Sequence, residues 1–308
     1  MNIQDLIIIG GGPAGLTAGI YAGRAKLKTL LFTGSPPGGQ LILSEIIDDF
    51  PGFPEKLSGK ELLEKITAQT KKFGIEVIEQ NVVSVDFQKK PFVIKTNNKN
   101  EYLAKSVIVA TGASNKWLGL EREKELIGRG ISVCAVCDGF FFKDKIVAVA
   151  GGGDSAMETA VTLTKYAQKV FIIHRRDEFK AAKGLQEEVL NNPKIEIIWN
   201  TIITEIQGDQ FLKGIIIEDV NTKEKKLLNL DGLFLAIGYK ATVDFLQGQL
   251  ELNKDGSIKV IDNTKTSVDG VFAAGDVCDF KYKQAITAAG CGAMALLDVD
   301  KWLREQDK

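Results

Sequence analysis

Two cysteines and an aspartate in the middle of the chain have the types and spacing for redox chemistry. Cys134 and Cys137 are separated by two residues, a spacing at which two thiols close into a small disulfide and reopen by exchange. Asp138 follows directly and can protonate a departing thiolate if its pKa is raised. The segment therefore predicts a redox-active dithiol with an acid–base partner.

Other interpretations of these residues are open at the level of sequence. The cysteine pair fits half of a zinc site or two buried thiols, and Asp138 fits a cap of the aromatic segment that follows. Zinc needs four ligands, and the remaining candidates are Cys278, Cys291 and the single His174. We expect Cys278 and Cys291 to be buried residues and no metal to be bound. Because His174 belongs to a different motif, Asp138 is the proton donor by elimination.

The composition is that of an ordinary globular protein. The chain has 308 residues, 44% hydrophobic and 26% charged, which is enough for one large or two medium domains. Its net charge of -1 argues against nucleic acid, and no apolar run approaches the roughly 20 residues of a membrane span. With four cysteines and a strand-like segment beginning at Asp5, we expect a cytoplasmic protein without a signal peptide.

A pattern of strand, glycine turn, helix and strand occurs twice and must position the dithiol. Asp5–Phe32 carries it around the turn Gly10–Gly15, and Lys145–Ile173 carries it around the turn Gly151–Ala156. The strands and helices expected in the two copies are, in order, Asp5–Ile9, Leu16–Ala25, Thr29–Phe32, Ile146–Ala150, Met157–Tyr166 and Lys169–Ile173. Two equal βαβ units predict two dinucleotide sites.

The first turn has the three glycines that dinucleotide binding requires. Gly10 permits a tight turn, Gly12 lets the backbone approach a pyrophosphate, and Gly15 lets the helix pack against the strand. The helix N-terminus then presents free N–H groups and a positive dipole end to the phosphates. A single glycine turn of this kind fits a tight turn alone equally well, so the duplication is what supports the interpretation.

The residues after the second strand of each copy indicate which nucleotide binds. In the second copy they are His174, Arg175 and Arg176, with Lys180 beyond. Arginine binds a 2′-phosphate bidentately, whereas an acid would repel it, so this turn favours NADPH over NADH. A solvated basic turn is the alternative. In the first copy Thr33 takes this position without an acid.

A β-rich stretch follows each copy and sets the domain boundaries. The expected strands are Ile75–Asp86, Phe92–Thr96 and Ser106–Thr111, and then Ile195–Ile206, Gly214–Asp219 and Leu233–Ile237. The two stretches close on the similar segments Ala110–Gly112 and Ala236–Gly238. We expect short hinges near 113–117 and 239–244. The predicted domains are 1–113 with 245–308, and 114–244, which contains the dithiol.

A third glycine signal lies late in the chain. Gly275 and Asp276 end a short apolar segment that reads as a buried strand. The Asp276 carboxylate is placed to accept hydrogen bonds from the sugar-like chain of a cofactor. The alternative is an ordinary helix cap or turn aspartate.

The order and spacing of these motifs resemble the low-molecular-weight thioredoxin reductases along essentially the whole chain. The motifs that carry the resemblance are Gly10–Gly15, Gly38–Leu41, Phe50–Phe53, Ala110–Ala113, Cys134–Gly139, Gly151–Ala156, His174–Arg176, Ala236–Gly238, Gly275–Asp276 and Gln284–Gly290. The resemblance implies an α/β fold of two Rossmann-like, three-layer domains, each with a β-meander, in the class II pyridine nucleotide-disulfide oxidoreductase architecture. It also implies a homodimer that binds FAD in the discontinuous domain and NADPH in the other, and that reduces thioredoxin.

The same resemblance implies individual roles. It makes Cys137 the thiol that faces the flavin, Cys134 the thiol that attacks thioredoxin, and Asp138 the acid–base group. The residues that would line FAD are Gly10, Gly12, Pro13, Ala14, Gly15, Thr33, Gly39, Gln40, Asp49, Val83, Ala110, Thr111, Gly112, Gly275, Asp276, Gln284, Ala285 and Ile286. Those that would line NADPH are Gly151, Gly153, Asp154, Ser155, Ala156, His174, Arg175, Arg176, Lys180, Ile237 and Gly238.

Three positions depart from the family pattern. Asp49 stands where many members have asparagine, and Lys283 and Lys180 each stand where members have arginine. Because lysine lacks the planar fork of arginine, we expect weaker contact between Lys180 and a 2′-phosphate. None of the three changes removes a reacting group.

The placement of the dithiol beside the NADPH turn, away from the flavin, predicts motion. We expect the second domain to rotate on its two hinges, so that NADPH and the dithiol reach the flavin in turn. Flavin–dithiol oxidases and peroxiredoxin-reducing flavoproteins share this frame; the former need no NADPH site, and the latter usually carry an extra N-terminal domain. A redox-sensing or nucleotide-sensing module would leave the combination of two cofactor sites and a dithiol without a purpose.

Overall fold

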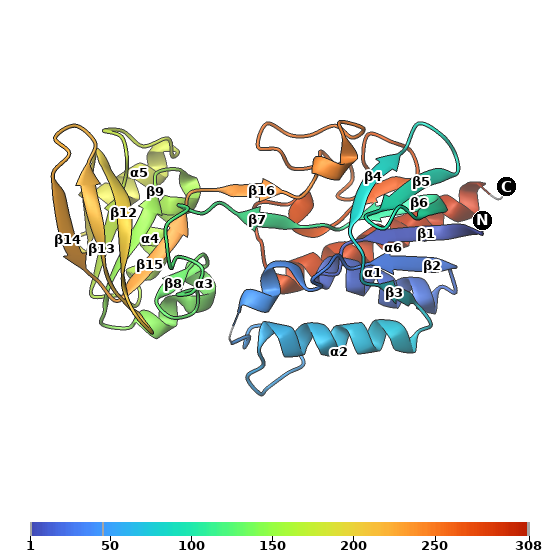
Figure 1. Cartoon of the computed structure of the whole chain (residues 1–308), viewed down its shortest axis with the longest axis horizontal. Coiled ribbons are helices and arrows are strands. Elements are labelled where there is room, and N and C mark those ends of the chain that lie inside the picture. The colour runs from blue at the N-terminus through green and yellow to red at the C-terminus, as the bar shows by residue number, and fades with distance from the viewer. Residues whose placement is uncertain (1, 45, 307–308) are drawn as a thin grey trace. The chain divides into compact units, whose positions relative to one another are not determined.

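The computed structural model describes residues 2–44 and 46–306, and these fall into two compact units (Figure 1). Unit 1 contains the described residues of Met1–Ser114 and Lys240–Lys308, and unit 2 is Asn115–Tyr239. The chain therefore passes twice between the units. Its two crossing segments, β7 (Ala113–Asn115) and β16 (Tyr239–Ala241), pair as a two-stranded sheet.

Unit 1 is built on a sheet whose central part is parallel. Its parallel strands are β1 (Ile3–Ile9), β2 (Thr29–Phe32), β3 (Glu76–Ile78), β6 (Glu101–Val109) and β17 (Val271–Ala273). They run in the order β3-β2-β1-β6, with β17 beside the second half of β6. The first half of β6 pairs instead with the antiparallel strand β5 (Phe92–Thr96), and β5 pairs in turn with β4 (Val82–Asp86) at the edge of the sheet.

The single strand expected over Ile75–Asp86 is wrong, because this segment forms β3 and β4 at opposite edges of the sheet. Between the two strands the Gln80 N–H donates to the Ile78 carbonyl at 3.1 Å, which closes a tight turn. The chain then crosses to the opposite edge of the sheet, where β4 lies. The turn interrupts a run of residues that otherwise reads as continuous strand.

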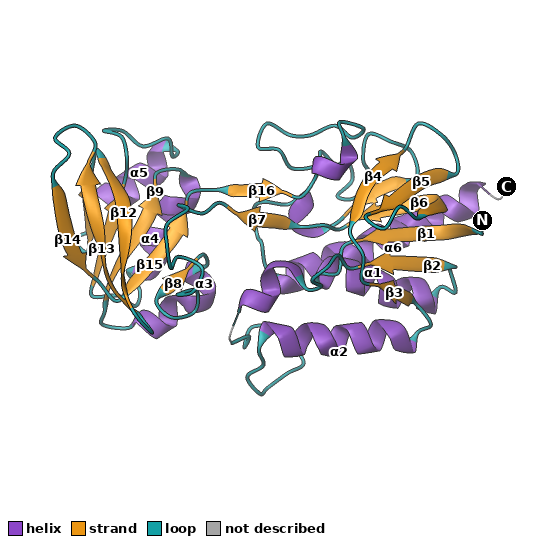
Figure 2. Cartoon of the chain, viewed as in Figure 1, coloured by secondary structure: helices purple, strands orange, loops and turns teal. Residues whose placement is uncertain are grey.

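Alternation along β1 places an apolar core on each face of the unit 1 sheet. Leu6 and Ile8 pack in one core with residues of the helices α1 (Pro13–Arg24), α2 (Gly59–Lys72) and α6 (Ala285–Gln306). Figure 2 draws these helices as purple ribbons. Ile7 and Ile9 face the meander side. All four side chains are at most 3% exposed. Burial on both faces is what a parallel sheet between two layers requires.

Unit 2 repeats this plan. Its parallel strands are β8 (Ile131–Ser132), β9 (Ile146–Gly151), β10 (Lys169–Ile173), β11 (Ile195–Ile198) and β15 (Gly232–Ala236). Its helices are α3 (Ala135–Asp138), α4 (Asp154–Leu163) and α5 (Lys183–Leu190). Its meander is β12 (Thr201–Gly208), β13 (Leu212–Asp219) and β14 (Lys225–Asn229). The strand expected over Ile195–Ile206 is split at Asn200, whose φ of 51° ends β11 before β12 begins.

The duplication predicted from the sequence is confirmed by the order of strands. Unit 1 runs β3-β2-β1-β6 with β17 added, and unit 2 runs β11-β10-β9-β15-β8. In each unit the first strand of the glycine motif lies between its own second strand and a later parallel strand. This is the crevice at which open α/β sheets bind nucleotides. Short 3₁₀ segments are also present: η1 (Gly39–Leu43), η2 (Gly139–Phe142), η3 (Asp244–Leu246) and η4 (Gly275–Val277).

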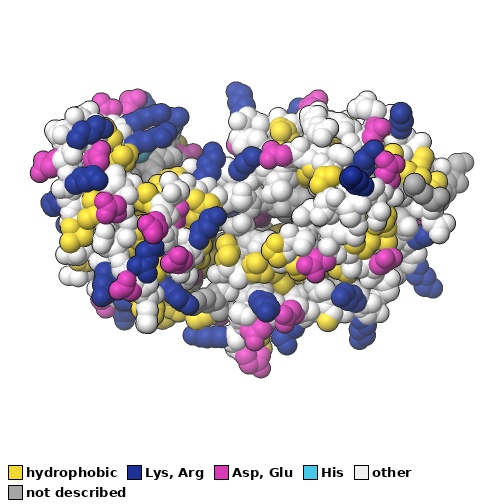
Figure 3. All heavy atoms as spheres, in the orientation of Figure 1, with side chains coloured by type: hydrophobic (Ala, Val, Ile, Leu, Met, Phe, Trp, Pro, Cys, Tyr) yellow, Lys and Arg dark blue, Asp and Glu magenta, His cyan; other side chains and the backbone are white. Residues whose placement is uncertain are grey.

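Figure 3 shows how charged side chains are distributed on one face of the protein. Basic and acidic side chains are interspersed over that face. Within residues 2–44 and 46–306, no helix combines the length and the apolar character needed to cross a bilayer.

Candidate functional site

The dithiol predicted from the sequence is closed in the structure. Cys134 and Cys137 are joined by a disulfide, with their Cα atoms 5.4 Å apart. The helix α3 begins directly after Cys134, and the Cys137 N–H donates to the Cys134 sulfur at 3.1 Å. An N–H directed at a sulfur stabilises negative charge there, which favours a thiolate on Cys134 after reduction.

Asp138 lies beside this pair and is held by Ser132. The Ser132 hydroxyl donates to Asp138 Oδ2 at 2.6 Å, and it accepts the Cys134 N–H at 3.0 Å. Ser132 is only 4% exposed. One buried hydroxyl therefore connects the acid to the backbone of the first cysteine. Ser132 was not among the predicted site residues, since a lone serine two positions before the pair gives no recognisable signal.

An exposed apolar surface adjoins the dithiol. Val136, between the cysteines, is 71% exposed, and Phe140 is 67% exposed. Phe140 packs edge-on against both Phe141 and Tyr166, with ring centroids 6.2 Å apart in each pair. Large aromatic side chains exposed in a cluster are typical of a protein-binding surface.

The dithiol and the second glycine turn leave the same edge of the unit 2 sheet. Strands β8, β9, β10 and β15 are parallel, so their carboxyl ends open on one side. Cys134 follows β8, the turn beginning at Gly151 follows β9, His174 follows β10, and Ile237 follows β15. The structure thus groups the predicted NADPH residues along the edge from which the dithiol segment also starts.

The second glycine turn leaves open space where a phosphate would approach. A Cβ on Gly153 would meet no atom within 4 Å, whereas one on Gly151 would lie 2.4 Å from the Ala236 carbonyl oxygen. Gly153 precedes α4, and no side chain caps the N-terminus of that helix. The Asp154 carboxylate instead accepts the Ala182 N–H at 2.7 Å and ties the turn to the following loop. These features fit a dinucleotide phosphate.

His174 braces this turn. Its ring is 8% exposed, with Nδ1 3.0 Å from the Gly151 carbonyl and Nε2 2.9 Å from the Glu178 carbonyl. A Cβ on Gly152 would lie 2.1 Å from the same ring. Both ring nitrogens are therefore occupied by backbone, so His174 positions the turn and cannot serve as the acid of the dithiol.

The basic residues beyond His174 point to solvent. Arg175, Arg176, Lys180 and Lys183 are all exposed. In the described part of the chain, no carboxylate lies within ion-pair distance of any of them. A group of uncompensated cations beside an open glycine turn is suited to a phosphate.

The first glycine turn has the geometry that its three glycines predict. A Cβ on Gly10 would lie 2.0 Å from the Ala110 carbonyl oxygen, and one on Gly15 would lie 1.9 Å from the Gly10 carbonyl oxygen. A Cβ on Gly12 would meet nothing within 4 Å. No side chain caps α1 there, in contrast to α2, where Ser58 and Glu61 form a complete capping box. The open turn and the uncapped helix fit the pyrophosphate of a dinucleotide.

Asp276 lies next to this turn. Its residue neighbour Gly275 has φ +77°, and a Cβ there would lie 3.0 Å from the Ala14 Cβ and 3.5 Å from the Ala288 Cβ. The first turns of α1 and α6 and the Gly275–Asp276 segment are thus side by side. Burial, followed by the charge of Asp279, raises the pKa of Asp276 to about 6, and Lys283 opposes this. No described residue hydrogen-bonds the Asp276 carboxylate, so it is available to a ligand.

The other residues predicted to line FAD are placed less uniformly. Ala110, Thr111 and Gly112 follow β6 beside Gly10, and Thr111 Oγ1 donates to the Thr242 carbonyl at 2.7 Å. Thr33 Oγ1 donates to the Gly34 carbonyl at 3.0 Å. Gln284 lies just before α6, and Ala285 and Ile286 are the first residues of that helix. Gly39 and Gln40 lie on η1, Asp49 lies in the loop after η1, and Val83 lies on β4. Val83 is 47% exposed, and no described contact links it or Asp49 to the glycine turn.

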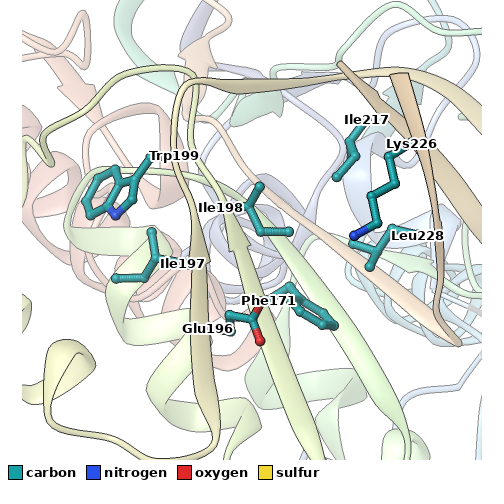
Figure 4. A pocket seen from close by; sticks show the side chains of 8 residues that line it. All are labelled: Phe171, Glu196, Ile197, Ile198, Trp199, Ile217, Lys226 and Leu228. Carbon is teal, nitrogen blue, oxygen red and sulfur yellow. The ribbon is translucent and has the colours of Figure 1, made fainter. Parts of the chain in front are cut away.

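A cavity of about 420 Å³ lies elsewhere in unit 2 (Figure 4). It is lined by Phe171, Glu196, Ile197, Ile198, Trp199, Ile217, Lys226 and Leu228. In Figure 4 the side chains of Trp199 and Ile197 lie on one side of the view, and those of Ile217, Lys226 and Leu228 lie on the other. None of these residues belongs to the dithiol or the glycine turn, so the chemistry is not in this cavity.

Comparisons with known proteins agree with the geometry. The profile described as pyridine nucleotide-disulphide oxidoreductase matches residues 4–292. A thioredoxin reductase of Rickettsia felis is 48% identical over 304 residues, covering 97% of this chain and 98% of that protein. A solved thioredoxin reductase from Giardia duodenalis is 41% identical, with a TM-score of 0.93, and covers 99% of this chain and 100% of its own. A solved thioredoxin reductase from Lactococcus lactis, described as its FR conformation, is 36% identical, with a TM-score of 0.66. The match covers 98% of this chain and 99% of the Lactococcus chain.

A sequence match over nearly the whole chain, together with the paired glycine turns and the closed dithiol, leads to one assignment. This chain belongs to the pyridine nucleotide-disulphide oxidoreductase family, among its thioredoxin reductases.

Proposed function

We propose that this protein reduces the disulfide of thioredoxin with electrons from NADPH, through FAD and the Cys134–Cys137 pair. The observation that carries the proposal is the closed disulfide beside Asp138, within a unit that also holds an open glycine turn and uncompensated arginines. The net reaction consumes NADPH and a proton and converts the thioredoxin disulfide into two thiols.

The two cofactors are assigned to the two glycine turns. FAD binds in unit 1, with its pyrophosphate at the Gly12 end of α1 and hydroxyl groups of its sugar-like chain on Asp276. NADPH binds in unit 2, with its pyrophosphate at the Gly153 end of α4 and its 2′-phosphate on Arg175 and Arg176. The support is the open space at each turn and the absence of side-chain caps at the N-termini of α1 and α4. In unit 2 the unpaired positive charges of Arg175 and Arg176 add to it, because they are opposite in sign to a phosphate.

The chain's own residues carry the thiol and proton steps. Bound flavin supplies a carrier that accepts hydride from NADPH and passes two electrons to the disulfide. On reduction the bond between Cys134 and Cys137 breaks, and Asp138 delivers a proton to one of the two thiolates. Ser132 holds the Asp138 carboxyl in place during this transfer. Cys134 then attacks thioredoxin, and Cys137 closes on Cys134 to release the reduced product.

Rotation of unit 2 between the two half-reactions is part of the proposal. Only two segments, β7 and β16, connect the units, which suits a rigid-body hinge. The solved relatives support such motion. The Giardia and Lactococcus proteins resemble this chain at similar identities and nearly full coverage, yet their TM-scores of 0.93 and 0.66 differ widely.

We further propose a cytoplasmic homodimer that docks thioredoxin on the aromatic surface beside the dithiol. Val136 and Phe140 supply exposed apolar area there. For the dimer, the support in unit 1 is exposed apolar side chains on η1 and α6, which include Leu43 (40% exposed) and Leu297 (57% exposed). A cytoplasmic location agrees with four cysteines of which one close pair is redox-active.

An anaerobic titration of the FAD-loaded protein with NADPH tests the proposal. The flavin absorbance should bleach with NADPH and return when oxidised thioredoxin is added. Bleaching that thioredoxin does not reverse would contradict the proposal. Rapid recovery in air alone would favour a flavin–dithiol oxidase instead.

A further inference from the structure

Two cysteines outside the dithiol lie in unit 1 near Asp276. Cys278 follows η4 and packs against the core on the meander side of the sheet, whereas Cys291, in α6, packs against the core on the helix side. Both are free thiols and only partly buried, where the sequence predicted buried residues. Cys291 lies close enough to Cys278 to contribute to the raised pKa of the Cys278 thiol. They therefore meet at the end of the sheet from its two faces.

Gly275 is the residue on which the two thiols converge. The Cys278 thiol donates to the Gly275 carbonyl at 3.3 Å. The Cys291 thiol lies close enough to the Gly275 backbone for that backbone to oppose the rise in the pKa of Cys291 that burial causes. The same carbonyl also accepts the N–H groups of Cys278 at 3.0 Å and Asp279 at 3.1 Å. With φ +77° and the Ala14 methyl close by, Gly275 has a conformation that its surroundings must impose.

We propose that Cys278 and Cys291 are positioning residues, which hold the Gly275 peptide from opposite sides and so aim the Asp276 carboxylate at the cofactor. The inference rests on the proposed binding of FAD in unit 1. Because no described residue hydrogen-bonds the Asp276 carboxylate, the backbone that carries it decides where that carboxylate points.

The ionisation of the thiols agrees with this role. Burial raises the pKa of Cys278 to about 12, and burial also raises the pKa of Cys291. Cys278 therefore keeps its proton and remains a hydrogen-bond donor at neutral pH. A protonated thiol is a poor nucleophile, so this pair does not compete with Cys134 and Cys137 in disulfide exchange.

Titration of the apoprotein with FAD, followed by quenching of flavin fluorescence, tests the proposal. Cys278→Ala should weaken FAD binding by roughly 2- to 10-fold, the range of one neutral hydrogen bond. Cys291→Ala should do the same. Cys278→Ser keeps a donor and should restore most of the affinity. As a control, Val268→Ala removes apolar volume from the same core and should change the affinity less than about 2-fold.

Two results would overturn the inference. One is wild-type affinity in both alanine variants; the other is a Cys278→Ser variant as weak as Cys278→Ala. Failure of the wild-type apoprotein to bind FAD would instead refute the proposed function itself. Alkylation gives a second readout: iodoacetamide at pH 8 should modify Cys134 and Cys137 after reduction but spare Cys278 until the protein is unfolded. Rapid alkylation of native Cys278 would also overturn the inference.

Discussion

Ser132 and Asp138 form the smallest unit of the proposed chemistry. The sequence alone led to Asp138 by excluding the only histidine, and the structure supports that exclusion because both His174 nitrogens face backbone carbonyls. The structure then adds the partner that the sequence could not reveal, the buried Ser132 hydroxyl at 2.6 Å. The fold brings Ser132 and Asp138 together across a turn, and no sequence motif marks such a pair.

Removal of the Ser132 hydroxyl should change the pH dependence of dithiol reoxidation. In Ser132→Ala the Asp138 carboxylate loses a donor and holds its proton more tightly, so the profile should move up by about one pH unit. Stopped-flow reoxidation of the reduced protein by thioredoxin measures this. Ser106→Ala, which removes another buried hydroxyl with a 2.6 Å hydrogen bond, should leave the profile in place. An unmoved Ser132→Ala profile would return Asp138 to a capping role.

Asp276 carries a free-energy cost of folding, because a carboxyl group is buried at the proposed FAD site. Its pKa in the folded state, about 6, lies above the ordinary 3.8, so the folded protein binds this proton more tightly than the unfolded chain. The Asp276 contribution to stability is therefore largest below pH 4 and is lost as the pH rises from about 4 to 6.

Asp276→Asn should remove that pH dependence. The variant apoprotein should be more stable than wild type at pH 7 by roughly 2 kcal/mol, while its affinity for FAD falls, because an amide accepts fewer hydrogen bonds. Urea unfolding at pH 4 and pH 7, paired with FAD titration, measures both. A variant less stable than wild type at pH 7 would show that the Asp276 carboxylate has a structural partner.

At the scale of elements, the glycine turns and the bounds of some strands were predictable, but the breaks within two longer expected strands were not. β2 and β10 have the predicted bounds, because apolar runs and flanking turns fix them. The expected strands over Ile75–Asp86 and Ile195–Ile206 are each two strands in the structure. The backbone can change direction within one or two residues, as it does at Asn200, and so short a turn leaves the apolar pattern almost unchanged. The chain also returns to unit 1 at Lys240, before Asp244, because β16 pairs with β7.

The basic turn after β10 should decide the choice of nucleotide. Arg175→Ala combined with Arg176→Ala should raise KM by roughly 10- to 100-fold for NADPH but by less than about 3-fold for NADH, since only NADPH carries the 2′-phosphate. Steady-state kinetics with both nucleotides measure this. Lys124→Ala with Lys213→Ala removes the same charge elsewhere in unit 2 and serves as the control. Equal increases for the two nucleotides would refute the phosphate assignment.

At the scale of the whole molecule, the proposed electron transfer requires motion between the units. A short cross-linker that joins unit 1 to unit 2 should preserve one half-reaction, either flavin reduction by NADPH or reduction of thioredoxin, and abolish steady turnover. Single-turnover absorbance and steady-state rates on the same cross-linked sample separate the two. Full turnover in a fully cross-linked sample would exclude the rotation.

The most direct test of the central claim follows the Cys134–Cys137 bond itself. The FAD-loaded protein is treated anaerobically with NADPH, quenched with iodoacetamide, and analysed by mass spectrometry, with Cys137→Ser as a parallel sample. We predict that NADPH makes both Cys134 and Cys137 available for alkylation. Oxidised thioredoxin, added after NADPH is consumed and before the quench, should close the disulfide again. A Cys134–Cys137 bond that stays intact while NADPH reduces thioredoxin, or a Cys137→Ser enzyme that turns over, would contradict this prediction.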